Sequence, residues 1–359
     1  MAKKIKNCFI QNITYEKLYK AYLFARRGKR HRKDVIKFGL RYEERLLLMC
    51  NKLNSGNYTF GNFNEFYVYE PKLRRILAAP FKDRIIHTWY VKEFIEKIFV
   101  PQFISTSYAC IKGRGMHKCA LDVKRAMYKI SKKNSKAYVV KMDVAKFFDS
   151  IDRRILFEII KKKVSDKYFL DFTFKLLESS KKYDKKEGIG IPIGNYSSQM
   201  FGNIYLNEVD KYAKEVLKCK YYFRYLDDTC IICKNKEEAE YILSKLIIFY
   251  AEKLHLLLNK KTDIFPIKNG VNFCGYKISN KGYMNLRVKG KKKFIKKVKK
   301  VKYLLSNGEI TVQEAKISLA GNIGYIKYAR VDELVKKYLY SYFFKMIYIV
   351  YTYIILGKV

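Results

Sequence analysis

The alternation of apolar and polar residues along the chain predicts both amphipathic helices and short strands. Helical periodicity is found up to about residue 45 and over residues 83–99, 152–164, 166–179, 198–217, 237–257 and from 288 onward. Short apolar or alternating runs bounded by Gly, Pro or polar residues predict strands within 58–80, 137–143, 221–225, 229–233 and 271–287. We expect Ser150 or Asp152 to cap the helix that reaches residue 164.

The charge of the chain is strongly positive. Lys and Arg number 75 and Asp and Glu 33, which gives a formal net charge of +42. Such a charge destabilises a compact state unless a polyanion neutralises it, so nucleic acid is the expected partner, ahead of an anionic membrane. Hydrophobic residues make up 49% of the chain, too many for a disordered basic tail. The composition therefore predicts a folded nucleic-acid-binding protein.

Two basic clusters are the candidate RNA-binding segments. One lies near residues 26–33, where a solvated charged surface is the alternative interpretation, and the other spans 289–302. The candidate RNA contacts are Arg26, Arg27, Lys29, Arg30, Lys291, Lys292, Lys293 and Lys296.

The cysteines indicate a reducing compartment. The eight cysteines have no paired spacing, and no secretory segment follows Met1, so we expect a cytoplasmic protein. Cys230 and Cys233 have zinc-like spacing, but they lie in a strand-like run without a second ligand pair. Buried strand packing is therefore favoured over a metal or redox site.

The apolar run of residues 338–356 resembles a membrane span. It carries Lys345 near its middle and many tyrosines, whose hydroxyls suit a wet surface better than the centre of a bilayer. We therefore expect a packed C-terminal helix and no membrane partner.

Three aspartates indicate metal chemistry. Asp227 and Asp228 lie between two predicted strands, where adjacent like charges repel unless a cation binds them. Hard oxygen ligands favour Mg²⁺. Asp143 ends another apolar strand, and if the strands are neighbours, three carboxylates can hold two metal ions roughly 3.5–4 Å apart. An exposed turn is the alternative for an isolated Asp-Asp pair.

These segments together resemble the motifs of reverse transcriptases. Tyr225-Leu-Asp-Asp228 resembles the Tyr-x-Asp-Asp motif of that family, and Asp143 to Phe148 its first catalytic motif. Further similar segments are 72–84 (fingers), 107–115, 256–262 (palm lysine) and 272–276 (primer grip). The resemblance covers about residues 60–290.

The resemblance implies an α+β right-hand polymerase fold, with fingers and palm built from an antiparallel sheet plus helices and with a helical thumb. The implied divisions are a basic helical extension over 1–57, fingers and palm over 58–287, and a basic thumb over 288–359. The implied activity is copying of a template RNA into DNA from a DNA or RNA primer, with deoxynucleoside triphosphates as substrates.

The resemblance also assigns the catalytic groups. Asp143, Asp227 and Asp228 would be ligands of two Mg²⁺ ions, for which Mn²⁺ can substitute. Lys261 would be the general acid for pyrophosphate, with Lys260 as the alternative.

The remaining assignments concern the nucleotide and the primer. Phe148 would exclude a ribose 2′-hydroxyl, and Arg75 and Lys82 would contact the triphosphate, with Arg74 as the alternative to Arg75. The implied pocket residues are Ile193, Gly194 and Gln199, and the implied primer-grip residues are Phe273, Gly275 and Tyr276.

One motif departs from most of the family. Where most reverse transcriptases have Gln-Gly-x-x-x-Ser-Pro, this chain has Ile193-Gly194-Asn-Tyr-Ser-Ser198-Gln199. That departure resembles the enzymes of diversity-generating retroelements, which copy RNA with errors at adenines, usually together with a small accessory protein. The alternatives are a group II intron or phage-defence enzyme, and a catalytically silent RNA-binding scaffold.

Overall fold

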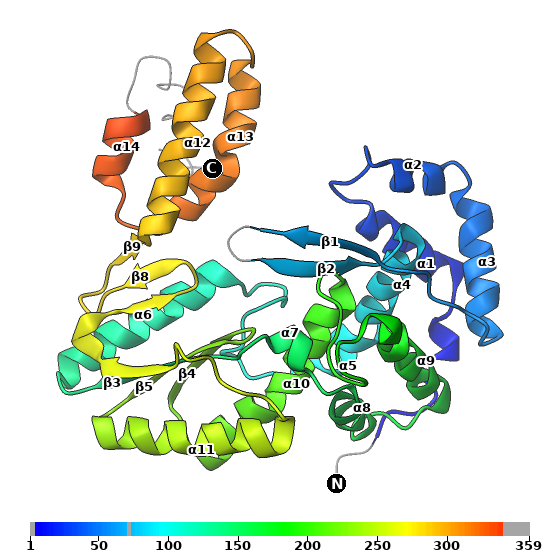
Figure 1. The fold of residues 1–359 in the computed structure, drawn as a ribbon, viewed down its shortest axis with the longest axis horizontal. Coiled ribbons are helices and arrows are strands. Elements are labelled where there is room, and N and C mark those ends of the chain that lie inside the picture. The colour runs from blue at the N-terminus through cyan, green and yellow to red at the C-terminus, as the bar shows by residue number, and fades with distance from the viewer. Residues whose placement is uncertain (1–3, 70–72, 340–359) are drawn as a thin grey trace. The chain divides into compact units, whose positions relative to one another are not determined.

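The computed structural model describes residues 4–69 and 73–339 of the chain (Figure 1). Contacts within it define two compact units, each assembled from several stretches of sequence. The first unit contains residues 1–111, 143–218 and 243–261, and the second contains 112–142, 219–242 and 262–359. This division does not test the boundaries predicted at residues 57 and 287, which stay predictions.

The first unit contains the predicted N-terminal helices and the predicted helix at 83–99. The N-terminal helices are α1 (Tyr15–Ala25), α2 (Lys33–Gly39) and α3 (Tyr42–Asn54). The next helical stretch consists of α4 (Phe81–Tyr90), a π-helical turn (Val91–Ile95) and α5 (Glu96–Ile98). The fully buried Trp89 of α4 donates its Nε1 hydrogen to Asn12 O at 2.9 Å. The N-terminal segment is thereby anchored on α4.

The rest of the first unit combines a hairpin with helices. Strands β1 (Asn64–Val68) and β2 (Arg74–Ala78) pair antiparallel. The helices are α7 (Phe147–Ser150), α8 (Arg153–Lys161), α9 (Lys167–Glu178) and α10 (Tyr196–Lys211), the last followed by a π-helical turn (Tyr212–Val216). The Asp152 side chain accepts hydrogen bonds from the first turn of α8, so the predicted cap is confirmed as Asp152.

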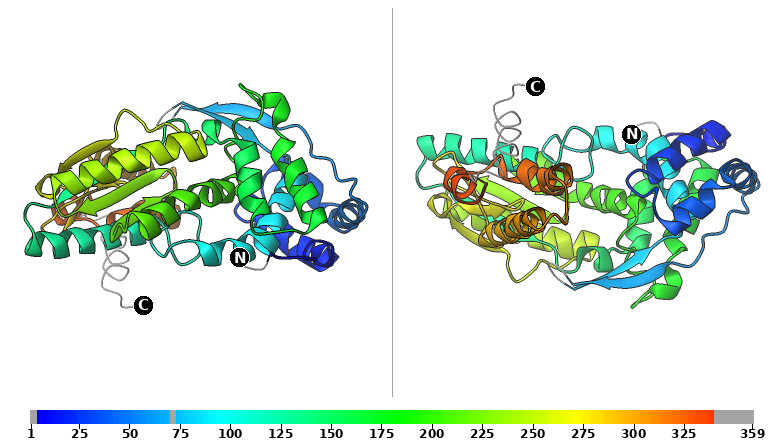
Figure 2. Two further views of the ribbon diagram at one scale, coloured as in Figure 1. Left: turned by 90° about the horizontal axis from the view of Figure 1, so that it is seen from below. Right: turned by 90° about the horizontal axis from the view of Figure 1, so that it is seen from above.

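A sheet with the strand order β4-β5-β3-β6 organises the second unit. Its strands are β3 (Tyr138–Asp143), β4 (Tyr221–Tyr225), β5 (Asp228–Cys233) and β6 (Asp263–Pro266). Helix α6 (Met116–Lys133) packs on this sheet (Figures 1 and 2). Cys230 and Cys233 are buried in β5 as free thiols, which confirms their predicted role in strand packing.

Helix α11 (Lys236–Leu254) follows β5 along the chain and contributes residues to both units. Short 3₁₀ turns lie at Ile10–Asn12, Val100–Gln102, Lys181–Tyr183 and Ile267–Asn269.

The second unit continues with a small antiparallel sheet and a helical group. The strands are β7 (Val271–Phe273), β8 (Tyr276–Ile278) and β9 (Met284–Leu286), and the helices are α12 (Val288–Ser306), α13 (Val312–Ile326) and α14 (Asp332–Leu339). Thr311 and Glu314 form a capping box that starts α13. Apolar side chains of the three helices, including Phe294, Leu319 and Val335, share one core.

The helix predicted at 338–356 lies, beyond Leu339, outside the described residues. Within residues 4–69 and 73–339, every helix is too short or too polar to cross a bilayer.

Candidate active site

The two adjacent aspartates lie at the tip of the β4–β5 hairpin, as the sequence predicts. Tyr225 pairs with Asp228, which leaves Leu226 and Asp227 in the turn. Leu226 adopts a left-handed φ of 56°. The fully buried Arg224 donates Nη1 to Leu226 O at 3.0 Å. The hairpin tip therefore carries two successive carboxylates, and the hydrogen bond from Arg224 holds the backbone of the turn.

The side-chain ammonium of a lysine contacts one of these two carboxylates. Lys141, on β3, forms an ion pair with Asp228 Oδ1, and its Nζ is 5.2 Å from the centre of the Phe273 ring. That oxygen is buried from solvent. Carboxylate oxygens are ligands that Mg²⁺ prefers, so Asp227 and Asp228 fit a divalent cation by their chemistry. Among the described residues, no group of three or more His, Cys, Asp or Glu is arranged to hold a metal ion.

Asp143, the last residue of β3, belongs to the first unit and is held there by Asn259. Asn259 Nδ2 donates to Asp143 Oδ2 at 3.3 Å, and its backbone N donates to Asp143 O at 2.7 Å. Asn259 Oδ1 also accepts a hydrogen bond from Lys261 N at 3.1 Å. Both candidate general acids, Lys260 and Lys261, are exposed. Asn259 thus links the backbone of Lys261 to Asp143, one of the predicted metal ligands.

Phe148, the predicted steric gate, is half-buried in α7 beside Phe147. The two ring centres are 5.2 Å apart. Gly202 on α10 makes room for both rings, because a Cβ there would lie 2.9 Å from Phe147 Cε1 and 3.5 Å from Phe148 Cε1. The position of the gate therefore depends on a glycine that is 54 residues later in the sequence.

Ile193 and Gly194 meet strand β2 at close range. Leu77 N donates to Ile193 O at 3.1 Å. Gly194 has a φ of +116°, and a Cβ at this position would lie 3.0 Å from Ile76 Cγ2. A residue larger than glycine would therefore be strained and would press on the strand. The glycine at position 194 therefore has a local structural reason.

The next residue, Asn195, is buried, and its side-chain amide joins the start of α10 to the end of β2. Its Nδ2 donates to Leu77 O at 3.0 Å, and its Oδ1 accepts from Ala79 N at 3.0 Å. One turn further on, Gln199 is exposed, and its Oε1 lies 3.3 Å from the Cys110 thiol. Gln199 remains accessible to a ligand.

Below the first turn of α10 lies the imidazole of His87. Its Nδ1 is 2.6 Å from Ser197 Oγ, and burial lowers the pKa of His87 to about 4. The ring is therefore neutral near pH 7. His87 thus adds no positive charge next to the first turn of α10.

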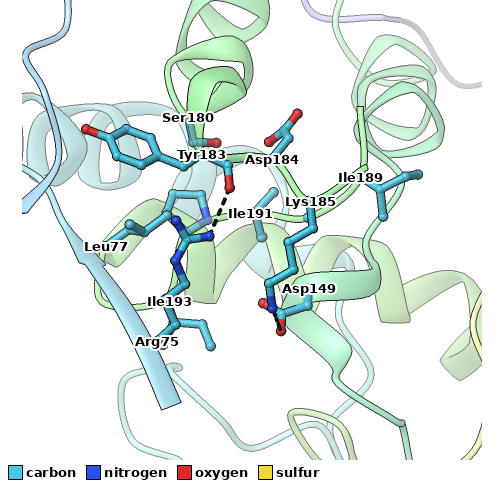
Figure 3. Close-up of a pocket in the computed structure, with 12 residues that line it drawn as sticks. Arg75, Leu77, Asp149, Ser180, Tyr183, Asp184, Lys185, Ile189, Ile191 and Ile193 are labelled. Atoms are coloured by element: carbon cyan, nitrogen blue, oxygen red, sulfur yellow. Dashed lines mark hydrogen bonds and ion pairs between the residues drawn. The ribbon is translucent and has the colours of Figure 1, made fainter. Parts of the chain in front are cut away.

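Arg75 and Lys82, the predicted triphosphate contacts, differ in their environments. The Arg75 guanidinium donates to both carboxylate oxygens of Glu65 at 2.7 and 2.8 Å. It also donates to Tyr183 O at 2.9 Å (Figure 3). Hydrogen bonds to Glu65 raise the pKa of Arg75. Arg75 lines a pocket of about 50 Å³, whereas Lys82 and the alternative residue Arg74 are exposed. In the free protein Arg75 is therefore already engaged by a carboxylate.

The predicted primer grip is a tight turn between β7 and β8. Phe273 and Tyr276 are fully buried, and Gly275 has a φ of +83°. The Tyr276 hydroxyl donates to Tyr325 O at 2.6 Å, and the Tyr325 hydroxyl donates to Gly275 O at 2.7 Å. His117 Nδ1 is 2.8 Å from Tyr276 Oη. Reciprocal hydrogen bonds thus join this turn to α13.

Most of the candidate RNA contacts in the two basic clusters are exposed, whereas Arg26 and Lys29 are partly buried. Helix α12 buries Phe294 and Val298 in the helical core and exposes Lys291, Lys292, Lys293 and Lys296. Near the end of α1, Arg26 donates to Tyr22 Oη at 3.0 Å and Arg27 lies over the Phe24 ring. These positions suit phosphate contacts, and their role in RNA binding stays a prediction.

Sequence reasoning missed three residues that hold site residues in place: Gly202, Asn195 and Asn259. Asn259 directly precedes the two candidate lysines and Asn195 directly follows Gly194, so proximity to the motifs was a usable signal. Nothing in the local sequence indicates that Gly202 lies against the gate.

A solved structure shows the fold class. The telomerase from Candida albicans, solved with a TWJ fragment of telomeric RNA, is similar with a TM-score of 0.50 and 10% identity. The match covers 88% of this chain and 64% of the telomerase chain. The predicted α+β right-hand polymerase fold is confirmed.

The sequence then shows the family. The family model described as reverse transcriptase (RNA-dependent DNA polymerase) matches residues 70–278. The chain belongs to the reverse transcriptase family.

Three curated relatives share about a quarter of their aligned residues with this chain. Protein YkfC of Escherichia coli is 24% identical over 274 residues, which cover 66% of this chain and 71% of YkfC. The group II intron-encoded protein LtrA of Lactococcus lactis is 26% identical over 186 residues, covering 50% of this chain and 30% of LtrA. The putative COX1/OXI3 intron 2 protein of Saccharomyces cerevisiae is 24% identical, and 24% of its length is matched. The chain thus spans less than a third of these two intron proteins.

Proposed function

We propose that this chain is an RNA-directed DNA polymerase that copies a template RNA into DNA from a DNA or RNA primer. The observation that carries the proposal is the Tyr225–Asp228 hairpin tip, with two carboxylates in the order typical of the family. The formal charge of +42 supports a nucleic-acid substrate. The free thiols support a reducing compartment, and we place the activity in the cytoplasm.

The carboxylates of Asp143, Asp227 and Asp228 would hold two Mg²⁺ ions, with Mn²⁺ as a substitute. Bound there, the ions would activate the primer 3′-hydroxyl and stabilise the leaving pyrophosphate. Lys261, or its neighbour Lys260, supplies a proton to the pyrophosphate.

Other side chains select and orient the substrates. Phe148 excludes ribonucleotides by contact with the 2′-hydroxyl, while Ile193, Gly194 and Gln199 border the nucleotide. Arg75 and Lys82 contact the triphosphate, and for Arg75 this requires exchange of Glu65 for phosphate oxygens.

The primer end and the RNA are bound by other parts of the chain. Phe273, Gly275 and Tyr276 hold the primer end. The exposed lysines of α12 and the basic side chains that follow α1 (Arg26, Arg27, Lys29 and Arg30) bind RNA phosphates.

The finer proposal is error-prone copying at template adenines, as in diversity-generating retroelements with a small accessory protein. Its support is Ile193, which occupies the place of a family glutamine and whose side chain offers no hydrogen bond. The second candidate is a group II intron-type enzyme, and the observation that favours it is the similarity to LtrA. The error rate opposite adenine, measured on one template RNA, separates the two candidates.

The test of the polymerase proposal is primer extension by the full chain carrying Asp227→Asn and Asp228→Asn. These changes keep the side-chain shape and remove the charge that would bind the metal, so we expect extension to fall to background while RNA affinity persists. Asp263→Asn is the matched control, because Asp263 is an exposed carboxylate at the start of β6. Extension above background by the double variant would contradict the assignment.

A further inference from the structure

A guanidinium is buried behind the loop of residues 188–194. The side chain of Arg153 is 2% exposed. It donates Nε to Glu178 Oε1 at 3.0 Å, and Nη1 and Nη2 to the two Asp184 oxygens at 2.8 and 2.5 Å. Nη1 also donates to Gly190 O at 3.0 Å. One side chain thus joins two carboxylates and a loop carbonyl.

Stability alone does not account for this arrangement. A buried ion pair gains little over a well-packed apolar group, because the loss of hydration offsets the attraction between the charges. The next residue on α8, Arg154, has a side chain that is 90% exposed. Planar bidentate bonds instead fix direction and distance, which a point charge does not. The main contribution of Arg153 is therefore to fix the position of the loop through the bond to Gly190 O.

Backbone hydrogen bonds connect the loop to the predicted gate. Ile191 N donates to Phe148 O at 2.9 Å, and Gly190 N donates to Ile151 O at 2.8 Å. Gly190 has a φ of +98°, and a Cβ at that position would lie 3.3 Å from Asp149 O. The loop and the Phe148 segment are therefore in direct contact, so a displacement of Gly190 would also move the gate.

The other end of the loop carries Ile193, whose carbonyl accepts the hydrogen bond from Leu77 described above. Between Gly190 and Ile193 there are only two residues, one of them Pro192, whose fixed φ limits local adjustment. A change in the position of Gly190 is therefore passed on to Ile193. Both predicted selectivity residues depend on one anchor.

We infer that Arg153 is a positioning residue for nucleotide selection: through Gly190 O it sets the loop that places Ile193 and supports Phe148. Arg153 does not touch the nucleotide. The inference rests on the proposed polymerase function. Loss of the forked contact loosens the loop, so the KM for deoxynucleotides rises and discrimination against ribonucleotides and mismatches falls, while the rate at saturation persists.

The test compares Arg153→Lys with Arg154→Lys in the full chain. A lysine retains the charge but not the fork, and Arg154 provides the same change at the adjacent exposed position. Single-nucleotide primer extension gives KM and kcat for deoxynucleotides and ribonucleotides, and thermal unfolding reports the fold. We expect Arg153→Lys to raise the deoxynucleotide KM about two- to tenfold, as for loss of one hydrogen bond. We expect kcat to stay within about twofold and Arg154→Lys to match the parent.

Milder variants cover the case in which Arg153→Lys does not fold. Asp184→Asn removes charge from the bidentate partner, and Glu178→Gln removes it from the partner that makes one hydrogen bond. We expect both to raise KM, Asp184→Asn more strongly. A folded variant set with parental KM and discrimination overturns the inference, as does a loss confined to kcat. Absence of extension by the parent protein removes the polymerase proposal itself, and the inference with it.

Discussion

The loop of residues 188–194 in the first unit and the turn of residues 273–276 in the second unit are held in different ways. Both contain glycines with positive φ, +98° at Gly190 and +83° at Gly275. The loop is fixed by the buried guanidinium of Arg153 and by backbone hydrogen bonds. The turn is fixed mainly by neutral aromatic side chains: the Tyr276 and Tyr325 ring centres are 5.0 Å apart, and their hydroxyls make the reciprocal hydrogen bonds described above.

This difference predicts which substitutions each region tolerates. A charged network depends on every partner being present, because a buried group left without one is costly. Packed rings depend on shape, since a close-packed interior has no room for added atoms. We therefore expect loop variants to alter nucleotide choice and turn variants to alter the stability of the second unit.

The largest expected effect is that of Phe148→Ala, on the loop side of the comparison. Removing the ring opens space for a 2′-hydroxyl, so ribonucleotide use relative to deoxynucleotide use should rise roughly a hundredfold, about 2.8 kcal/mol. Competitive primer extension with the two nucleotide types measures it. Gly275→Ala provides the contrast and should leave this ratio unchanged. Unaltered sugar discrimination in Phe148→Ala would mean that another residue is the gate.

The next effect concerns the turn. Gly275→Ala places a methyl group 2.7 Å from Tyr325 Oη in a left-handed conformation. We expect the free energy of unfolding to fall by about 2–3 kcal/mol, from backbone strain and displacement of Tyr325. Urea unfolding followed by tyrosine fluorescence measures the loss.

Gly290→Ala is the matched control for the turn. Its added Cβ would also face Tyr325 Oη, but at 3.5 Å, an ordinary contact, and within α12. Alanine in a helix is favoured over glycine by up to about 1 kcal/mol, so this variant should be neutral or stabilising. Equal losses in the two glycine variants would show that the turn does not depend on the fit against Tyr325.

Much of the fold was predictable because its signals are local. The apolar runs on either side of Asp227 and Asp228 predicted the hairpin, and Asp152 was an expected cap because a carboxylate before an amphipathic run satisfies free backbone N–H groups. Interleaving of the chain between the two units was not predictable. It depends on which distant segments pack together, and no periodicity encodes that.

The support of the candidate site was predictable only in part. Arg153 and Arg154 are adjacent residues of the same type, so the sequence does not distinguish them. In the fold, Arg153 is buried and Arg154 is exposed. The partners of Arg153 lie 25, 31 and 37 residues away, so nothing near it signals burial. Residues that carry chemistry occur in recognisable motifs, whereas those that hold them are identified by contacts across the fold.

The smallest expected effect is that of Ile193→Gln, again on the loop side. Ile193 lies between two fixed points, the Leu77 hydrogen bond and the Arg153 anchor, so a longer polar side chain there would enter the nucleotide pocket rather than shift the loop. A glutamine can hydrogen-bond the nucleotide, and one such contact contributes about 0.5–1.5 kcal/mol, or two- to tenfold in discrimination. We expect misincorporation to fall by that factor, most of all opposite template adenine, while extension continues. Sequencing cDNA made by both enzymes on one template RNA measures it, with Ile189→Gln as the control for a polar change in the same loop. Equal adenine error rates would remove Ile193 from base selection, and would leave the intron-type alternative as the better account of this chain.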